Sequence, residues 1–432
     1  MEKTYVACGG IEKDLCDKEM EELLTGALSE ALKDSGKVIA LPPDITRIHS
    51  KAGFLTEITS NYLKDRLGAV LPALGTHKPM IDAEISRMFG NTPKNKFLVH
   101  NWRNNITELG RIEDSFVEKI TEGKVCFDWP VQVNKLLTKD NRNFSLIISI
   151  GQVVVHEVCG MSNHAKNIFV GTGGKEAIDK SHFIGAVYGI EKIMGRINTP
   201  VRNLFDEGFN RFGNKLPPIL WVLTVINKRT ENETGKENGT YAVRGLYIGF
   251  GRDCFEKAAL LSSKVNVNLV DEPVNKMLVY LNPEEYRTTW LGNKAIYRTR
   301  MAMADSGELI ILAPGLERFG EDLELDQFIR KYGYRSTNEI LKITKKDNSN
   351  LCAAAHLIHG SSEGRFTIRY CPGEKMSRNE IEDTGFKWGN FNEMKEKFDI
   401  NKLSSGWNTL PCQERFFYVS NPALGLWTNQ QL

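Results

Sequence analysis

Short apolar runs that end at polar residues recur along the first half of the chain. The runs cover residues 37–42, 69–74 and 145–150, and the polar residues that follow them include Asp44, His77 and His156. Helical patterns at 19–34 and 52–67 flank the first run. Buried strands that alternate with helices are typical of a mostly parallel sheet. The sequence therefore predicts an α/β fold.

Ligands of a parallel sheet bind beyond the carboxyl ends of its strands. We therefore expect Asp44, Arg47, His77 and His156 to converge, although they are far apart in sequence. The hydrophilic stretch 227–238 is expected to form an exposed hairpin tip between two strands.

The strand and helix pattern restarts after Lys264 and predicts a second α/β domain. The expected strands are 277–281, 308–313 and 365–370, and the expected helices are 294–304, 324–332 and 336–344. We place the boundary near Asn268, which gives domains 1–267 and 268–432. Both sheets should be mostly parallel, and an interdomain active-site cleft is the expected ligand site.

Charge and hydropathy exclude several classes of partner. The 56 Lys and Arg residues nearly balance 54 Asp and Glu residues, so no nucleic-acid partner is indicated. No run approaches the ~18 apolar residues of a membrane span, and the first 15 residues lack the apolar core of a signal peptide. We expect a cytoplasmic protein whose eight scattered cysteines are reduced thiols.

Two short loops carry residues suited to chemistry, and each has two interpretations. Arg47, close after Asp44, either holds a substrate carboxylate through paired hydrogen bonds or forms a local surface ion pair. His77, between Gly75 and Pro79, either exchanges a proton with a substrate hydroxyl or is only a polar or capping residue.

The densest group of reactive side chains lies in residues 155–167, directly after a predicted strand. This segment contains His156, Cys159, His164 and Lys166. A zinc cluster of its histidines and cysteine with His182 is disfavoured, because the spacing matches no common zinc module.

A glycine-rich loop follows this segment. The backbone amides of Gly171, Gly173 and Gly174 are candidates for binding a phosphate, but the loop lacks the spacing of an ATP-binding P-loop. Ser181 and His182 are expected at the start of a helix.

Four ordered matches resemble the nickel-dependent lactate racemase family of 2-hydroxy acid racemases and epimerases. They are the strand-end Asp44-x-Thr46-Arg47, the loop from Gly75 to Met80, the ten-residue interval from His156 to Lys166 and the sixteen-residue interval from Lys166 to His182. The recognisable motifs cover roughly residues 35–320.

The resemblance implies a nickel-pincer nucleotide that is joined to Lys166 as a thioamide and that contacts Asp44 and the loop of Gly171, Gly173 and Gly174. It also implies His182 as a nickel ligand, His77 and His156 as the acid/base pair, and Arg47 with Lys294 as the groups that hold the substrate. The assignment of Lys294 rests on its spacing to Ser306-Gly307, and an exposed helix lysine is the alternative.

The implied reaction inverts the alpha carbon of a small 2-hydroxy acid by hydride transfer to the pyridinium ring of the cofactor. The 1–267 domain would bind the cofactor and catalyse the reaction, the 268–432 domain would close over the substrate, and cofactor-synthesis enzymes are implied as partners. A non-catalytic nucleotide or phosphate-cofactor binding protein is the alternative. A hydro-lyase would need a carboxylate cluster that the sequence lacks.

The sequence departs from the family beside the expected substrate. Trp290-Leu291-Gly292-Asn293 stands where a Tyr-Gln pair precedes the family lysine, and Asn163-His164 replaces paired glycines ahead of Lys166. The added polar groups favour a polyhydroxylated acid such as a sugar acid, whereas Trp290 suits an aryl group or a sugar face.

Overall fold

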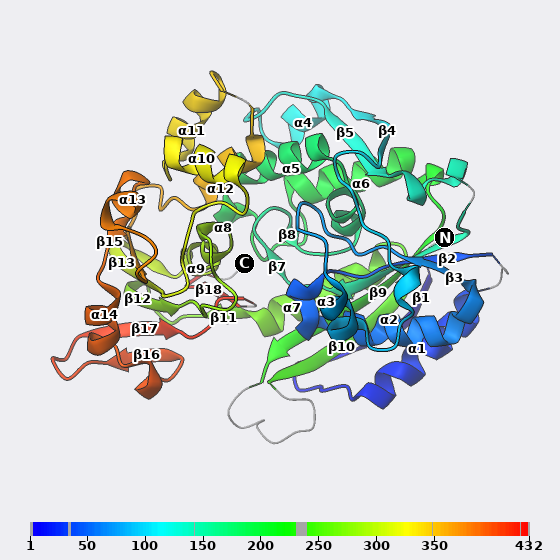
Figure 1. Cartoon of the computed structure of the whole chain (residues 1–432), viewed down its shortest axis with the longest axis horizontal. Coiled ribbons are helices and arrows are strands. Elements are labelled where there is room, and N and C mark those ends of the chain that lie inside the picture. Colours follow the sequence, from blue (N-terminus) through cyan, green and yellow to red (C-terminus); the bar gives the residue numbers. More distant parts are fainter. Residues whose placement is uncertain are drawn as a thin grey trace. The chain divides into compact units, whose positions relative to one another are not determined.

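The computed structural model describes residues 3–32, 36–141, 143–229, 240–347, 349–423 and 425–430. The chain forms two compact units (Figure 1): unit 1 comprises Met1–Ile184 and Ile193–Asn266, and unit 2 comprises Gly185–Lys192 and Val267–Leu432. The predicted boundary at 267/268 lies beside the division at 266/267. Residues 185–192, which we placed in the first domain, group with unit 2.

Unit 1 is built on a six-stranded sheet in the order β1-β10-β9-β6-β2-β3. The strands are β1 (Lys3–Gly9), β2 (Val38–Leu41), β3 (Leu67–Val70), β6 (Leu146–Gln152), β9 (Ile219–Lys228) and β10 (Tyr241–Phe250). Strands β3, β2, β6 and β9 pair in parallel, whereas β9, β10 and β1 pair antiparallel. The predicted α/β fold with a mostly parallel sheet is confirmed.

Helices α1 (Asp17–Ala31) and α2 (Ala52–Leu63) cover one face of this sheet, and α7 (Asp253–Asn266) packs on β9 and β10. Leu24 of α1 and Leu55 of α2 share a core with Ile148 and Ile150 of β6. All residues of β6 are buried. This accounts for its continuous apolar sequence, since a central parallel strand has no solvent-facing side.

The remaining elements of unit 1 connect these strands. They are α3 (Asp82–Phe89), β4 (Ile106–Ile112), α4 (Asp114–Ile120), β5 (Trp129–Asn134), β7 (Val155–His156), β8 (Gly160–Met161), α5 (Lys175–Tyr188) and α6 (Pro200–Phe212). β4 pairs with β5 and β7 with β8, both antiparallel. Helix α5 begins in unit 1, and its last residues belong to unit 2.

Unit 2 has a second six-stranded sheet in the order β15-β14-β13-β12-β17-β16, parallel except for the β16–β17 pair. Its strands are β12 (Val274–Tyr280), β13 (Met303–Ala313), β14 (Thr367–Pro372), β15 (Lys387–Trp388), β16 (Gly406–Thr409) and β17 (Arg415–Val419); β11 (Val267–Leu269) pairs separately with β18 (Leu426–Thr428). Its helices are α8 (Thr289–Gly292), α9 (Lys294–Thr299), α10 (Leu323–Tyr332), α11 (Thr337–Thr344), α12 (Leu351–His359), α13 (Arg378–Asp383) and α14 (Phe391–Lys397).

Two predicted helix boundaries are wrong. The helix expected at 294–304 ends at Thr299, because β13 begins at Met303. His182 does not start a helix, since α5 already begins at Lys175. The expected hairpin tip at 227–238 lies largely outside the described residues. Within the described part of the chain, every helix is too short or too polar to traverse a lipid bilayer.

Candidate active site

The parallel strands of unit 1 bring three connecting segments to one edge of the sheet. The loop after β2 carries Asp44 and Arg47, the loop after β3 carries His77, and the segment after β6 carries His156 and Lys166. Backbone and side-chain hydrogen bonds tie these loops together. The side-chain amide of Asn167 donates to the carbonyl of Leu41 at 3.3 Å, and the N–H of Gly75 donates to the carbonyl of Gly171 at 2.9 Å.

Asp44 and His77 form a direct pair. Asp44 Oδ2 lies 2.5 Å from His77 Nδ1, while Oδ1 accepts hydrogen bonds from the backbone and hydroxyl of Thr46. Burial by itself would raise the pKa of Asp44, but the hydrogen bond and charge of His77, with help from Thr46 and Arg47, lower it to about 2. The carboxylate is therefore ionised at neutral pH, although Asp44 is only 4% exposed.

Arg47 lies within electrostatic range of three of the other candidate residues. It sits in the short 3-10 helix Ile45–Ser50, where its φ of −116° departs from helical values. Its positive charge contributes to lowering the pKa values of Asp44, His156 and Lys166. A guanidinium in this position adds to a field that favours an anionic ligand.

His156 is buried at the end of β7, where it pairs with Gly160 of β8. Its Nδ1 atom accepts a hydrogen bond from the backbone N–H of Val158 at 3.1 Å. Burial lowers its pKa well below the ordinary value, Glu157 opposes this shift, and the charges of Lys166, His182 and Arg47 add to it. The ring is therefore neutral at physiological pH, and the influence of Lys166 and His182 on its pKa shows that both lie near it.

Lys166 precedes a π-helical turn at Asn167–Gly171. Burial lowers its pKa, and the charge of Arg47 adds to this effect against the opposing charges of Cys159, Glu157 and Asp44. A lowered pKa increases the neutral fraction of the amine, which is the form that acts as a nucleophile. Single π-helical turns are frequent at functional sites.

His182 lies within α5 with one ring nitrogen fixed by the helix backbone. Its Nδ1 atom is 2.7 Å from the carbonyl of Ile178, so Nδ1 carries the proton, and burial lowers the pKa of the ring to about 4. The Nε2 lone pair is thereby oriented as in a metal-ligating histidine with a carbonyl partner.

The zinc cluster considered from the sequence has no support in the structure. No three His, Cys, Asp or Glu side chains of the described residues gather in a geometry that could hold a metal. A metal ion bound by His182 would therefore need ligands from a cofactor. These features of His182 and Lys166 fit the nickel-pincer nucleotide that the sequence resemblance implies.

The glycine-rich loop has a packing role that the sequence did not predict. A Cβ atom on Gly173 would lie 1.9 Å from the carbonyl oxygen of Phe169, and one on Gly174 would lie 2.4 Å from Oε1 of Gln132. The N–H of Gly173 donates to Val170 at 3.3 Å. The proposed phosphate contacts of Gly171, Gly173 and Gly174 stay a prediction.

Asn163 and His164 are turned into the fold of unit 1 by positive φ angles of 70° and 54°. The His164 ring lies 4.3 Å from the ring of Trp221 and stacks on Phe255 at 5.1 Å. The side-chain amide of Asn163 donates to the backbone carbonyl of Gln152 at 3.3 Å. The preference for a sugar acid that rested on these two residues loses this support.

Two buried residues near the site were missed in the sequence. Arg202 of α6 is fully buried, donates to the carbonyls of Met161 at 2.6 Å and Asn163 at 3.3 Å, and so holds the segment ahead of Lys166. Gln152, at the end of β6, is 5% exposed, and neither polar atom of its side chain has a partner among the described residues. Neither residue belongs to a motif, so no local signal pointed to them.

Lys294 belongs to unit 2, where it is the first residue of α9, and its Nζ atom lies 5.9 Å from the ring centroid of Tyr286. Trp290 packs against His356, with ring centroids 4.4 Å apart. The substrate roles of Lys294 and Trp290, and the expected cleft between the domains, stay predictions.

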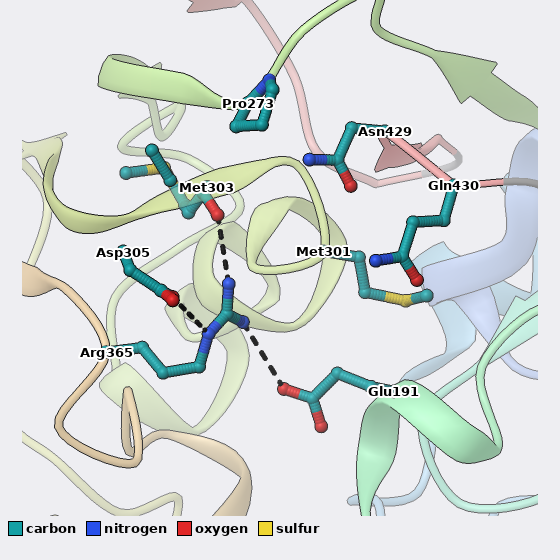
Figure 2. Close-up of a pocket in the computed structure, with 9 residues that line it drawn as sticks. Glu191, Pro273, Met301, Met303, Asp305, Arg365, Asn429 and Gln430 are labelled. Atoms are coloured by element: carbon teal, nitrogen blue, oxygen red, sulfur yellow. Dashed lines mark hydrogen bonds and ion pairs between the residues drawn. The ribbon is translucent and has the colours of Figure 1, made fainter.

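A cavity of about 430 Å³ lies within unit 2 (Figure 2). Arg365 donates to Asp305 at 2.9 Å and to the carbonyl of Met303 at 3.0 Å, and it lies 3.9 Å from Glu191. The charged groups of this cavity are thus paired with one another, and none of the candidate catalytic residues lines it.

Comparison with known proteins finds a family match in the N-terminal part of the chain. Residues 12–192 match the family model of the lactate racemase N-terminal domain. No curated protein sequence matches significantly.

Two solved structures share the fold. A protein from Thermotoga maritima is 24% identical, with a TM-score of 0.80 over 97% of this chain and 99% of that chain. The lactate racemase apoprotein from Thermoanaerobacterium thermosaccharolyticum is 15% identical, with a TM-score of 0.68 over 94% and 92% of the two chains.

Proposed function

We propose that this chain, whose residues 12–192 match the family model of the lactate racemase N-terminal domain, is an isomerase that inverts the alpha carbon of a 2-hydroxy acid with a nickel-pincer nucleotide. One observation carries the proposal: the charges of Arg47, Lys166 and His182 act on the buried His156, those of Arg47 and Asp44 act on Lys166, and His77 is hydrogen-bonded to Asp44. These are the residues that carry the resemblance to the family motifs in the sequence.

Lys166 and His182 are the residues that would hold the cofactor. Lys166 would be joined to it covalently, and His182 would bind nickel through Nε2, because Nδ1 is engaged by Ile178. The cofactor, when bound, supplies a pyridinium ring that accepts a hydride and returns it. Asp44 and the glycines of 171–174 are the further candidates for contacts with the cofactor.

His77 and His156 are the proposed acid/base pair for the substrate hydroxyl. Asp44 orients the His77 ring through the 2.5 Å contact. Arg47 would bind the carboxylate of the substrate through two parallel hydrogen bonds, and Lys294 is the proposed partner group from unit 2. The substrate class is a small 2-hydroxy acid, and a sugar acid is one member of it.

The test is to produce the protein together with the cofactor-synthesis enzymes and to measure intact mass and nickel content. A panel of 2-hydroxy acids, including lactate, malate, an aryl lactate and gluconate, is then followed by chiral chromatography. We expect a covalent adduct, bound nickel and inversion of at least one acid. An adduct without inversion of any acid would favour the non-catalytic cofactor-binding alternative, and no adduct would reject the proposal.

A further inference from the structure

The contact between Asp44 and His77 determines which nitrogen of His77 carries a proton. Asp44 Oδ2 lies 2.5 Å from Nδ1, and a carboxylate with a pKa of about 2 has no proton to donate at neutral pH. Nδ1 must therefore be the donor. In the neutral ring the lone pair lies on Nε2, since a neutral imidazole has one donor nitrogen and one acceptor nitrogen.

The neutral His156 ring has the opposite tautomer, with its proton on Nε2. The backbone N–H of Val158 points at Nδ1 from 3.1 Å, and an amide N–H can only donate. Nδ1 of His156 therefore carries the lone pair. Because burial keeps this ring neutral, its single proton lies on Nε2.

We propose that His77 and His156, in their neutral forms, are an unequal pair: the neutral His77 presents a proton acceptor at Nε2, and the neutral His156 presents a hydrogen-bond donor at Nε2. This inference rests on the proposed function, which directs both rings to the substrate oxygen. His77 is then the group that takes the hydroxyl proton. The O–H bond of the substrate breaks, an Nε2–H bond forms on His77, and the ionised Asp44 balances the new positive charge.

His156 can become a base only after a rearrangement. To accept a proton at Nε2, its own proton must move to Nδ1, where it would face the N–H of Val158 and break the 3.1 Å hydrogen bond. The substrate enantiomer whose hydroxyl faces His77 therefore loses its proton without rearrangement. The other enantiomer loses its hydroxyl proton only after the proton of His156 has moved from Nε2 to Nδ1. Before that, His156 can only donate a hydrogen bond to the substrate oxygen.

Ring-nitrogen NMR on the apoprotein tests the pair directly. Protein labelled with ¹⁵N-histidine is examined near pH 8 by long-range ¹H–¹⁵N correlation, and the variants His77→Gln and His156→Gln identify the two rings. We expect a protonated Nδ1 in His77 and a protonated Nε2 in His156. The same tautomer in both rings, or rapid averaging in His156, would overturn the proposal.

Asp44→Ala is the matched variant for this measurement. Removal of the carboxylate should shift His77 toward the Nε2–H form that free imidazole side chains prefer. His156 should keep its signals, because Val158 supplies its partner from the backbone. An unchanged His77 pattern would show that Asp44 does not set the tautomer and would overturn that part of the assignment.

The kinetic consequence needs single turnovers of the holoenzyme. The equilibrium constant fixes the ratio of the kcat/KM values for the two directions, so steady-state rates do not report the asymmetry. The holoenzyme is mixed separately with each enantiomer of an acid that the panel identifies. The enantiomer whose hydroxyl faces His77 should form the 2-oxo acid about tenfold faster than the other, the scale of one lost hydrogen bond. Equal rates would overturn the inference. If NMR shows opposite tautomers but the protein inverts no acid, the proposed function is rejected and the tautomer assignment is retained.

Discussion

The Nδ1 atom of His182 donates a hydrogen bond to the backbone carbonyl of Ile178 across 2.7 Å, one turn earlier in helix α5. The helix therefore fixes the ring and its tautomer before any metal arrives. If Nε2 binds nickel as proposed, His182→Ala should lower nickel retention and leave the organic part of the cofactor attached. Metal analysis and intact mass of the same sample separate these two effects.

Lys166→Ala should abolish covalent attachment, since no other group would form the thioamide. Lys175→Ala is the matched control, because this nearby lysine is paired with the carboxylate of Asp179 at 2.5 Å and should keep the adduct. Intact mass spectrometry decides the question. An adduct of equal mass on the wild type and on Lys166→Ala would contradict the assignment of Lys166.

Asp44 should make the free energy of unfolding fall as the pH is lowered below about 4. Its pKa falls from an ordinary value of 3.8 to about 2 in the folded protein, so the ionised carboxylate stabilises the fold above about pH 4. This stabilisation, about 2 kcal/mol at neutral pH, should disappear as the pH falls toward 2.

Asp44→Asn tests this dependence by chemical denaturation at several pH values. The variant should be less stable than the wild type at pH 7, and the difference between the two should shrink toward zero near pH 2. A difference in the free energy of unfolding that stays constant from pH 7 to pH 2 would show that the carboxylate charge has no such role.

The positions of Asp44, His77 and His156 after strand ends could be predicted from the sequence, because local patterns determine them. The polar residues after β2, β3 and β6 were placed at the strand ends because an apolar run followed by a polar loop marks a strand end without reference to the rest of the fold. His182 was misplaced because α5 already begins at Lys175, where Oε1 of Gln132, a residue far away in the sequence, accepts the N–H of Ala177 in the first turn.

His164 and Arg202 show a second limit of sequence analysis. His164 resembled a site residue because of its neighbours in the chain, but a positive φ turns it toward Trp221 and Phe255, which come from distant segments. Arg202 is a single arginine in a helix, and only the folded chain shows that its guanidinium reaches the carbonyls of Met161 and Asn163.

Arg202→Met should destabilise the protein by roughly 2–4 kcal/mol, because two buried carbonyls lose a charged donor. Arg211→Met, on the same helix but paired with Glu113 and Glu207 at the surface, should cost at most about 1 kcal/mol. Denaturant unfolding of both variants gives the comparison. Equal losses would mean that Arg202 has no special part in holding the segment ahead of Lys166.

Gln152→Leu should raise the free energy of unfolding of the apoprotein by about 1 kcal/mol, because it removes two buried polar atoms that have no partner in the described structure. Gln132→Leu is the control and should be destabilising, since Oε1 of Gln132 accepts the N–H of Ala177 at 3.3 Å. Thermal and denaturant unfolding of the two variants are compared. A clear loss of stability in Gln152→Leu would show that this amide has a partner after all.

The path of the alpha hydrogen distinguishes the proposed hydride transfer from simple enolisation. In hydride transfer the hydrogen stays on the cofactor between removal and return, so substrate deuterated at the alpha carbon should largely keep its label after inversion in ordinary water. Enolisation would release the hydrogen as a proton and exchange it with solvent. Mass spectrometry of the separated enantiomers measures the retained label.

The same experiment on two variants tests the histidines. His77→Ala and His156→Ala should each reduce turnover by roughly 100-fold or more, the usual scale for the loss of one acid/base group, and both should keep the cofactor mass. His77→Ala should have the larger effect on the first turnover of the enantiomer that faces it, because Asp44 holds that ring with its acceptor nitrogen exposed. Rapid loss of deuterium to solvent, or near-normal turnover in both variants, would contradict the proposed mechanism without affecting the α/β fold.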